Sequence, residues 1–319
     1  MIVVTGGFGF IGSNLIHALN ARGRTDVLVA DDLSDGRKFL NLRDATIADY
    51  EDWPGLATRL ESRVSDGHSI DVVYHLGACS DTVEWDGRKM MEMNYRASRD
   101  LLDFCDRHRV PLVYASSAAV YGTSTHCVEE PAFEKPLNVY GYSKLAFDQH
   151  VRSRLGTLQT RVVGLRYFNV YGPRESHKGR MASVVYHFSR QLAEGDEVRL
   201  FGASHGVAAG EQSRDFVHVD DIVRQTLWAW DGCQVSGIFN AGTGRPSTFN
   251  EVAEAVLDWH GRGRIAYVPF PQDLMNAYQH RTCADLARLS EAGFHEKQLT
   301  VEEGVKAYLD WLHRATMEQ

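Results

Sequence analysis

The first half of the chain alternates short apolar runs with longer segments in which apolar residues recur every three or four positions. Short runs of this kind are typical of strands buried in a parallel sheet, and the longer period indicates amphipathic helices. The runs are Ile2–Thr5, Val27–Ala30, Asp71–Leu76, Leu112–Ser116 and Arg161–Arg166, and the helical segments are Phe10–Ala21, Arg88–Arg107 and Gly141–Leu155. The alternation predicts an α/β fold with a Rossmann-type doubly wound parallel sheet.

The second half is less regular. Further strands are expected at Val217–Val219 and Gly237–Asn240, and helices at Phe249–His260 and Val301–His313. No internal repeat or clear linker separates the two halves. We therefore expect a Rossmann domain formed by residues 1–169 plus about 215–240, and a smaller interwoven α/β substrate domain formed by about 170–214 plus 241–319.

Composition narrows the possible partners. The chain has 319 residues, of which 44% are hydrophobic, so it can bury an ordinary globular core. It carries 34 basic and 42 acidic side chains, a net charge of −8, without a long basic run, which argues against nucleic acid and anionic membranes as partners. No apolar stretch approaches the length of a membrane-spanning helix, and no charged leader precedes the first strand, so a soluble protein is expected.

The five cysteines are scattered and contain no Cys-x-x-Cys pair. This pattern argues against a disulfide framework and against a thiolate zinc site. We expect no metal cofactor, and the free thiols fit a reducing cytoplasmic location.

A glycine-rich turn follows the first expected strand directly, with glycines at Gly6, Gly9 and Gly12, and a helical pattern begins at Phe10 and Ile11. Gly6 suits a tight turn, Gly9 lets the backbone approach a pyrophosphate, and Gly12 allows the helix to pack closely on the strand. Because the helix N-terminus then faces the anion, the turn predicts a dinucleotide site.

Acidic residues end the second expected strand. Asp31 and Asp32 lie about 20 residues beyond the glycine turn, where a carboxylate accepts hydrogen bonds from the adenosine ribose. Arg37 and Lys38 follow, and a cation here is suited to a 2′-phosphate. From these residues alone, NAD and NADP remain open.

Tyr140 and Lys144 are four residues apart in an expected helix and therefore lie on the same face. An ammonium beside a phenol favours the phenolate, which makes the pair a usable base. Ser117 directly follows the expected strand at 112–116, at the end where open α/β sheets place ligands, and its hydroxyl can orient a substrate alcohol. A packed tyrosine with a solvated lysine is the plain structural alternative for this spacing.

Three motifs together resemble the extended short-chain dehydrogenase/reductase superfamily that acts on nucleotide sugars. They are Gly6-Gly7-Phe8-Gly9-Phe10-Ile11-Gly12, Ser117-Ala118-Ala119-Val120-Tyr121-Gly122 and Tyr140-Gly141-Tyr142-Ser143-Lys144. The resemblance implies that Tyr140 is the general base, Lys144 its electrostatic partner and Ser117 the third catalytic group, with Asn94 on the cofactor side. Sugar dehydratases need an acid and a base after this serine, whereas Ala118 and Ala119 cannot transfer protons, so epimerisation or dehydrogenation is favoured over elimination.

A closer resemblance is to the ADP-L-glycero-D-manno-heptose 6-epimerase family. The segments that carry it are Gly77-Ala78-Cys79-Ser80, Glu84-Trp85-Asp86-Gly87, Glu134-Lys135-Pro136-Leu137-Asn138-Val139-Tyr140 and the run from Arg166 to Gly179, which contains Glu175-Ser176-His177-Lys178-Gly179. The family implies interconversion of ADP-D-glycero-β-D-manno-heptose and its L-glycero isomer with one tightly bound NADP per subunit. It also implies a homo-oligomer, a pentamer.

Inversion at carbon 6 requires more than one base. Hydride must leave and return on opposite faces of the carbon, so the exocyclic end of the sugar must rotate, and a second proton carrier becomes useful. Lys178 occupies the family's matching position. The alternative is that Lys178 only pairs with a phosphate.

The resemblance also implies two sets of ligand-binding residues. For the cofactor they are Gly6, Gly9, Phe10, Ile11, Gly12, Asp31, Asp32, Lys38, Leu76, Gly77, Ala78, Cys79, Ser80, Asn94, Lys144, Val170 and Lys178. For the substrate they are Ser117, Asn169, Arg180, His187, Phe201, Gly202, Ala203, Ser204, Arg214 and Tyr278, with Arg214 as the expected diphosphate ligand.

Two positions depart from the family pattern. Arg180 stands where a small polar residue is common, and Trp53 replaces a basic cofactor contact. An epimerase or dehydrogenase of another nucleotide sugar, and a non-catalytic dinucleotide sensor, are the competing hypotheses.

Overall fold

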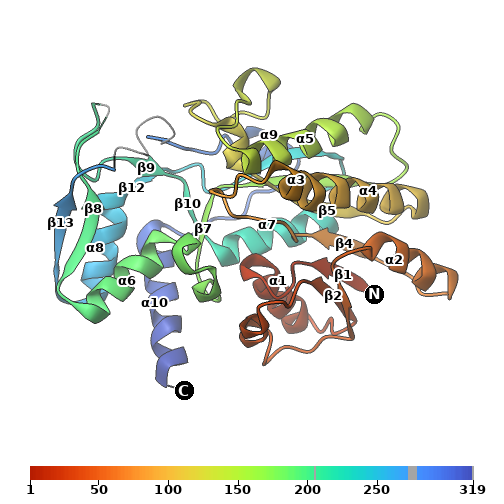
Figure 1. Ribbon diagram of the computed structural model, residues 1–319, viewed down its shortest axis with the longest axis horizontal. Coiled ribbons are helices and arrows are strands. Elements are labelled where there is room, and N and C mark those ends of the chain that lie inside the picture. The colour runs from red at the N-terminus through yellow and green to blue at the C-terminus, as the bar shows by residue number, and fades with distance from the viewer. Residues whose placement is uncertain (205, 272–278, 318–319) are drawn as a thin grey trace.

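The computed structural model describes residues 1–204, 206–271 and 279–317, and Figure 1 shows their path. The strands are β1 (Ile2–Thr5), β2 (Val27–Asp31), β3 (Asp49–Asp52), β4 (Val72–His75), β5 (Leu112–Ser117), β6 (Val162–Tyr167), β7 (Asn169–Tyr171), β8 (Glu197–Phe201), β9 (Ser213–Arg214), β10 (Phe216–His218), β11 (Gly237–Ala241), β12 (Ser247–Thr248) and β13 (Arg264–Val268).

The α-helices are α1 (Phe10–Ala21), α2 (Leu56–Ser65), α3 (Gly87–Met90), α4 (Ala97–His108), α5 (Val139–Arg154), α6 (Val184–Glu194), α7 (Val219–Asp231), α8 (Phe249–His260), α9 (Ala287–Glu291) and α10 (Val301–Met317). Short 3₁₀-helical segments are η1 (Gly36–Asn41), η3 (Ala118–Tyr121), η4 (Pro131–Phe133) and η5 (Ser176–Met181). The segment η2 (Met91–Arg96) is π-helical and joins α3 to α4.

Seven parallel strands form the main sheet in the order β11-β6-β5-β4-β1-β2-β3. This arrangement confirms the expected α/β fold with a doubly wound parallel sheet. The order changes direction between β1 and β4, and in such sheets ligands bind beyond the carboxyl ends of the strands at this point. Gly6 follows β1 and Leu76 follows β4, so two of the expected cofactor segments begin there.

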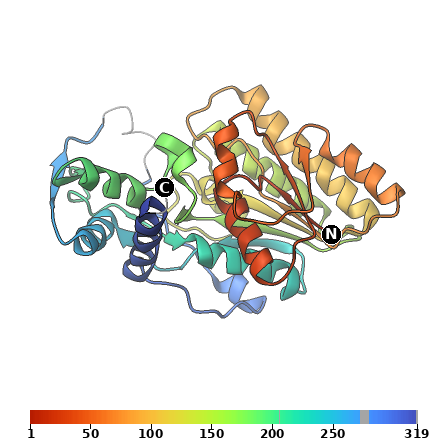
Figure 2. The same ribbon diagram turned by 90° about the horizontal axis from the view of Figure 1, so that it is seen from below.

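Helices cover both faces of the main sheet, as Figure 2 shows. On one face, Leu15 of α1 and Ile222 of α7 share a buried apolar cluster. On the other face, Leu60 of α2, Leu102 of α4 and Phe147 of α5 share a second cluster. Helix α5, which carries the expected Tyr-Lys pair, is therefore packed directly on the sheet.

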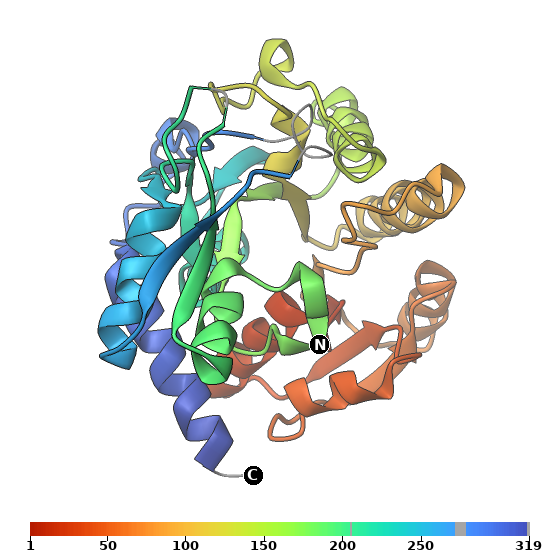
Figure 3. The ribbon, with the colours of Figure 1, turned by 60° about the vertical axis from the view of Figure 1, so that its left-hand side comes forward.

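A second group of elements surrounds the parallel pair of strands β8 and β13, as Figure 3 shows. Val185 of α6, Val256 of α8 and Val305 of α10 pack with Val198 of β8 in a third buried cluster. Two further two-stranded sheets are formed by β7 with β10 and by β9 with β12. Leu289 of α9, although late in the sequence, packs in the first cluster with the main sheet. The domain boundaries stated above stay a prediction.

The sequence pattern located most of the elements that build the sheet. The bounds of β1, β2, β4, β5 and β6 lie within one residue of the predicted runs at each end, and α1 and α8 begin and end where predicted. Strand β3 was not predicted, because its sequence Asp-Tyr-Glu-Asp is polar and it lies at the edge of the sheet. The helix predicted at Arg88–Arg107 is divided by the π-helical segment.

All five cysteines are free thiols, as their spacing indicated. Among the described residues, no helix combines the length and the apolar character that crossing a bilayer requires.

Candidate active site

The glycine turn between β1 and α1 is sterically closed to side chains. Gly6 has a φ of +66°, in the left-handed region, and a Cβ there would lie 2.7 Å from the Gly77 backbone. A Cβ on Gly12 would lie 2.1 Å from the carbonyl oxygen of Gly6, so this position leaves no room for a side chain. Within the described part of the chain, no side chain caps the N-terminus of α1 at Gly9, so its first N–H groups can face an anion.

A buried histidine links the two strands at the switch point. The Oγ1 of Thr5 lies 2.8 Å from Nδ1 of His75 and accepts a hydrogen bond from the Gly77 N–H at 2.9 Å. The Nε2 of His75 lies 2.7 Å from Oγ of Ser98 on α4. These contacts join the segment that follows β4 to the glycine turn.

Asp31 and Lys38 form a compact polar group beside the glycine turn. The carboxylate of Asp31 accepts hydrogen bonds from the N–H groups of Phe8 and Asp32, at 2.8 and 2.7 Å. Lys38 Nζ donates to Asp31 Oδ1 at 2.5 Å and to the carbonyl of Asp32 at 2.8 Å. Arg37, in contrast, is exposed and pairs with Asp35. Lys38 is therefore the cation that the fold holds at the end of β2.

The expected cofactor residues Leu76, Gly77, Ala78, Cys79 and Ser80 follow β4 in sequence. Asn94, which is buried in the π-helical segment, accepts a hydrogen bond from the Cys79 N–H at 2.8 Å and donates to the Cys79 carbonyl at 2.9 Å. It also donates to Ser143 Oγ on α5 at 3.0 Å. Asn94 thus ties the segment after β4 to the helix that carries Tyr140.

Tyr140 lies in the first turn of α5 and faces the end of β5. Burial raises the pKa of Tyr140, and hydrogen bonding with the side chain of Ser117 opposes the increase. The net shift is opposite to the one expected from the neighbouring lysine. Ser117 also caps the turn η3 by accepting a hydrogen bond from the Ala119 N–H at 3.1 Å.

Lys144 lies one turn after Tyr140, and its Nζ donates to the carbonyl oxygen of Ala115 on β5 at 2.9 Å. Burial lowers the pKa of Lys144 to about 8, although the charge of Asp148 raises it. The structure thus brings Ser117, Tyr140 and Lys144 together at the carboxyl end of β5.

Lys178 comes from the turn η5 and lies beside the N-terminus of α1. Its Nζ is 5.0 Å from the centre of the Phe10 ring and 4.0 Å from Oε2 of Glu175. Burial lowers the pKa of Lys178, and Glu175 opposes the decrease. Glu175 is fully buried and accepts hydrogen bonds from the N–H and Oγ of Ser183, both at 2.6 Å. Val170, an expected cofactor contact, lies on β7 upstream of this turn.

The expected substrate residues fall into several groups. Arg180 is exposed, pairs with Asp81 at 3.2 Å, and its carbonyl lies 3.4 Å from His187 Nε2. Phe201 ends β8, and Gly202, Ala203 and Ser204 follow it, where Gln212 donates to the Gly202 carbonyl and to Ser204 Oγ. Arg214, on β9, has its guanidinium carbon 5.7 Å from the centre of the Phe249 ring. Asn169 is exposed on β7, and Tyr278 lies outside the described residues.

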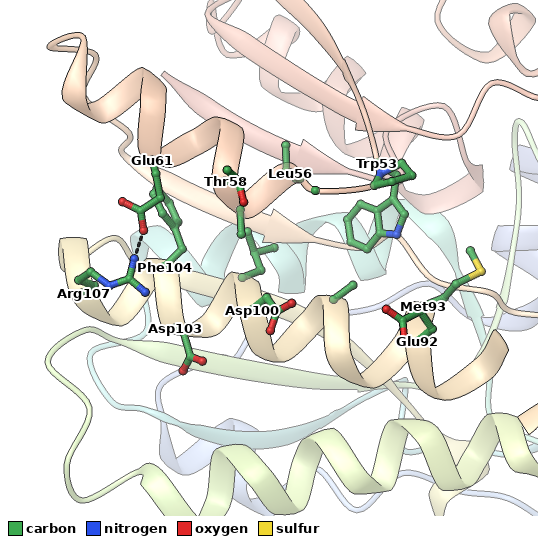
Figure 4. Close-up of a pocket in the computed structure, with 15 residues that line it drawn as sticks. Trp53, Leu56, Thr58, Glu61, Glu92, Met93, Asp100, Asp103, Phe104 and Arg107 are labelled. Carbon is green, nitrogen blue, oxygen red and sulfur yellow. Dashed lines mark hydrogen bonds and ion pairs between the residues drawn. The ribbon is translucent and has the colours of Figure 1, made fainter. Parts of the chain in front are cut away.

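Trp53 lies against the end of β4. Its indole stacks on His75 with ring centres 5.3 Å apart, and it lies at one end of a groove of about 530 Å³ between α2 and α4 (Figure 4). Glu61 and Arg107 pair at the other end. None of the predicted catalytic residues lines this groove.

Several supporting residues were not predicted from the sequence. Thr5, His75, Asp148 and Glu175 all make buried polar contacts next to the predicted residues. The spacing offered one usable signal, because Asp148 lies four residues after Lys144 and so shares its helix face. No local pattern connects Thr5 with His75, which is 70 residues away.

Comparisons with known proteins agree with this arrangement. Residues 2–242 match the model of the NAD dependent epimerase/dehydratase family. A protein of Alkalilimnicola ehrlichii described as ADP-L-glycero-D-manno-heptose-6-epimerase is 58% identical over 310 residues, which cover 97% of each chain.

Solved structures give the same result. The ADP-L-glycero-D-manno-heptose-6-epimerase of Helicobacter pylori superposes with a TM-score of 0.83 at 30% identity, covering 98% of this chain and 96% of that one. The UDP-glucose 4-epimerase of Thermotoga maritima, solved with UDP-glucose, gives a TM-score of 0.82 at 28% identity over 99% of both chains. This chain belongs to the NAD dependent epimerase/dehydratase family, and within it to the ADP-L-glycero-D-manno-heptose 6-epimerases.

Proposed function

We propose that this enzyme interconverts ADP-D-glycero-β-D-manno-heptose and ADP-L-glycero-β-D-manno-heptose with NADP, in the biosynthesis of the heptose of the lipopolysaccharide core. Tyr140 and Lys178 are the proposed proton carriers. The observation that carries the proposal is the grouping of Ser117, Tyr140 and Lys144 at the end of β5, in a chain 58% identical to a relative of that name.

The residues around the glycine turn fit a dinucleotide. A Cβ at Gly6 or Gly12 would collide with backbone, so only glycine leaves this surface free, and the uncapped N-terminus of α1 suits a pyrophosphate. NADP is favoured over NAD because Asp31 already accepts three hydrogen bonds within the protein, and Lys38 lies beside it. A carboxylate so occupied is a weak acceptor for a ribose hydroxyl, whereas the ammonium suits a 2′-phosphate.

The chemistry at carbon 6 needs hydride transfer on both faces of the ketone, and therefore proton transfer to and from its oxygen in two positions. The nicotinamide supplies hydride acceptance and return at that carbon. Tyr140, oriented by Ser117, takes or returns the proton of the 6-hydroxyl group in one configuration. Lys178 serves the other configuration, because burial lowers its pKa and so increases the fraction of neutral amine. The exocyclic end of the sugar turns between the two half-reactions.

Local donors hold the ADP-heptose. Arg214 is the proposed diphosphate ligand, since its planar guanidinium suits bidentate contacts. Asn169, Arg180, His187, the segment 201–204 and Tyr278 are the further proposed substrate contacts. Ala118 and Ala119 follow Ser117 and cannot transfer protons, which disfavours dehydration.

The direct experiment is incubation of the purified protein with ADP-D-glycero-manno-heptose, followed by NMR of the carbon 6 proton. We expect both configurations to accumulate. In deuterated water, hydride return keeps protium at carbon 6, whereas enolisation would introduce deuterium. An unchanged configuration would reject the proposed substrate, and a Tyr140→Phe variant as active as the wild type would reject the base.

The two-base scheme has its own test. Lys178→Met should lower the epimerisation rate by about 10²-fold or more, the usual contribution of a positioned acid or base. Lys89→Met is a matched control, because Lys89 is exposed and pairs with Glu84. A Lys178→Met enzyme that works at the wild-type rate would leave Tyr140 as the sole base.

Assembly and location complete the proposal. By resemblance to the family, we propose a homo-oligomer, a pentamer, in the cytoplasm. Light scattering on the purified protein measures the subunit number directly, and a monomer at assay concentration would contradict this part.

A further inference from the structure

Three polar side chains on α5 face one strand at intervals of four residues. Tyr140, Lys144 and Asp148 lie on the same face of the helix, since four residues make about one turn. Tyr140 contacts Ser117, and Lys144 contacts the carbonyl of Ala115. Asp148 is the third member of this row, and neither the sequence motif nor the proposed mechanism gives it a role.

Asp148 is fully buried and its carboxylate is saturated with hydrogen bonds. Oδ1 accepts from the hydroxyl of Tyr114 at 2.9 Å, and Oδ2 accepts from Ser116 Oγ at 2.9 Å. Both donors belong to β5, on either side of the residue that Lys144 contacts. The helix and the strand are therefore joined at successive residues from Tyr114 to Ser117.

A buried arginine completes the contacts of Asp148. Arg166 of β6 is fully buried, and its Nε donates to Asp148 Oδ2 at 2.8 Å. Its other nitrogens donate to Glu134 Oε1 at 2.6 Å and to the hydroxyl of Tyr121 at 3.0 Å. Arg152, on α5, also pairs with Glu134. The carboxylate is thus fixed by a charged partner as well as by two neutral donors.

The charges around Lys144 come from three elements. Asp148 faces it from α5 itself, and Cys79 faces it from the segment after β4. His75 at the end of β4 also interacts electrostatically with the Lys144 ammonium. Burial and this charge lower the pKa of His75 to about 3, so the imidazole is neutral. Asp148, which also pairs with Arg166, is the larger of the two influences that favour the Lys144 ammonium.

We propose that Asp148 is a positioning residue for the catalytic pair: held by Tyr114, Ser116 and Arg166, it fixes α5 on β5 and supplies the negative charge that keeps Lys144 protonated. The inference rests on the proposed function through the roles of Tyr140 and Lys144. It extends the catalytic motif by one helical turn, from Tyr-x-x-x-Lys to Tyr-x-x-x-Lys-x-x-x-Asp.

The first test is the pH profile of turnover. Asp148→Asn keeps the shape of the side chain but removes its charge, so Lys144 should lose its proton at lower pH. We expect the alkaline limb of the kcat profile to move to lower pH, with kcat reduced about tenfold at pH 8 and KM nearly unchanged.

Removing Asp148 alone leaves Arg166 short of a partner, and this change can prevent folding. The double variant Asp148→Asn with Arg166→Gln removes both charges together and should show the same displaced limb. Asp221→Asn is the control, because Asp221 is an equally buried carboxylate that pairs with Arg224 on α7. It should lower stability without moving the profile.

A second test does not depend on turnover. The unfolding free energies of a protein with Lys144 and of its Lys144→Met variant are measured against pH. The plot of their difference against pH bends at the pH where Lys144 titrates in the folded state. We expect that bend to move to lower pH when Asp148→Asn, or the double variant, is the background.

The outcomes separate the two proposals. A wild-type protein without activity on ADP-heptose counts against the proposed function, and the unfolding measurement then still decides the role of Asp148. An unmoved bend and an unmoved pH profile in both variants overturn the inference about Asp148. Equal movement in Asp221→Asn would also overturn it, because the effect would then be general destabilisation.

Discussion

At the scale of single residues, the surroundings of each charged side chain decide which ligand groups it is free to bind. Asp31 matches the acidic residue that binds a ribose in dinucleotide folds, but its oxygens are occupied by Phe8, Asp32 and Lys38. Lys38 is largely buried against this carboxylate, whereas the neighbouring Arg37 extends into solvent. Two adjacent cations in the sequence therefore have different environments in the structure.

Lys38→Ala should weaken the binding of NADP by about tenfold or more and leave the binding of NAD less affected, because only NADP carries a 2′-phosphate for the ammonium to bind. Calorimetric titration with each cofactor measures the two affinities. Arg37→Ala is the matched control and should change neither by much, since Arg37 is exposed and contacts Asp35. Equal losses for both cofactors would contradict this role of Lys38.

At the scale of secondary-structure elements, the start of α5 positions the catalytic tyrosine. Asn138 caps this helix by accepting a hydrogen bond from the Gly141 N–H at 2.8 Å. Gly141 is itself confined, because a Cβ there would lie 2.7 Å from the Ala119 carbonyl oxygen. The cap thus brings the first turn of α5 against η3, next to Ser117.

Asn138→Ala should cost about 1 kcal/mol of unfolding free energy, the usual effect of losing a helix cap, and should lower kcat because Tyr140 lies in the uncapped turn. Denaturant unfolding and steady-state kinetics measure the two effects. Thr300→Ala offers a comparison, since Thr300 caps α10 by accepting from the Glu303 N–H at 3.2 Å. If both variants lost the same stability and the same kcat, the position of the α5 cap would not matter for catalysis.

At the scale of the whole molecule, the active site costs stability. Lys144 is buried between a helix and the main sheet, and burial lowers its pKa from 10.5 to about 8. A decrease of this size corresponds to about 3 kcal/mol by which the folded state disfavours the charged amine. The fold tolerates this penalty because two large apolar clusters support the sheet from both faces.

Lys144→Met should therefore raise the unfolding free energy at neutral pH by about 2 kcal/mol, allowing about 1 kcal/mol for the lost hydrogen bond, while it abolishes turnover. Between pH values of about 8 and 10.5, the lysine of the unfolded chain is still protonated whereas the folded lysine is mostly neutral. The unfolding free energy of the wild type therefore increases with pH in this range. The gap between the proteins is constant below pH 8 and narrows above it. Denaturant unfolding across this range measures the gap, and a less stable Lys144→Met at pH 7 would contradict the expected penalty.

The sequence by itself determined the features that depend on neighbours along the chain. The turn from Gly6 to Gly12 and the Tyr140–Lys144 spacing were predicted because strand, helix and turn geometry act within a few residues. The buried strands of the main sheet were located for the same reason, whereas the polar edge strand β3 has no apolar run and was missed.

Only the tertiary structure decided which distant residues meet. Gly77 closes on Gly6, His75 joins Thr5 to Ser98, and Arg166 reaches Asp148 from another strand. These contacts follow from strand order and from the crossing of helices over the sheet, and no local pattern encodes them. The buried charges have the same origin, because a shift in pKa depends on how much water and which partner the folded chain leaves around each group.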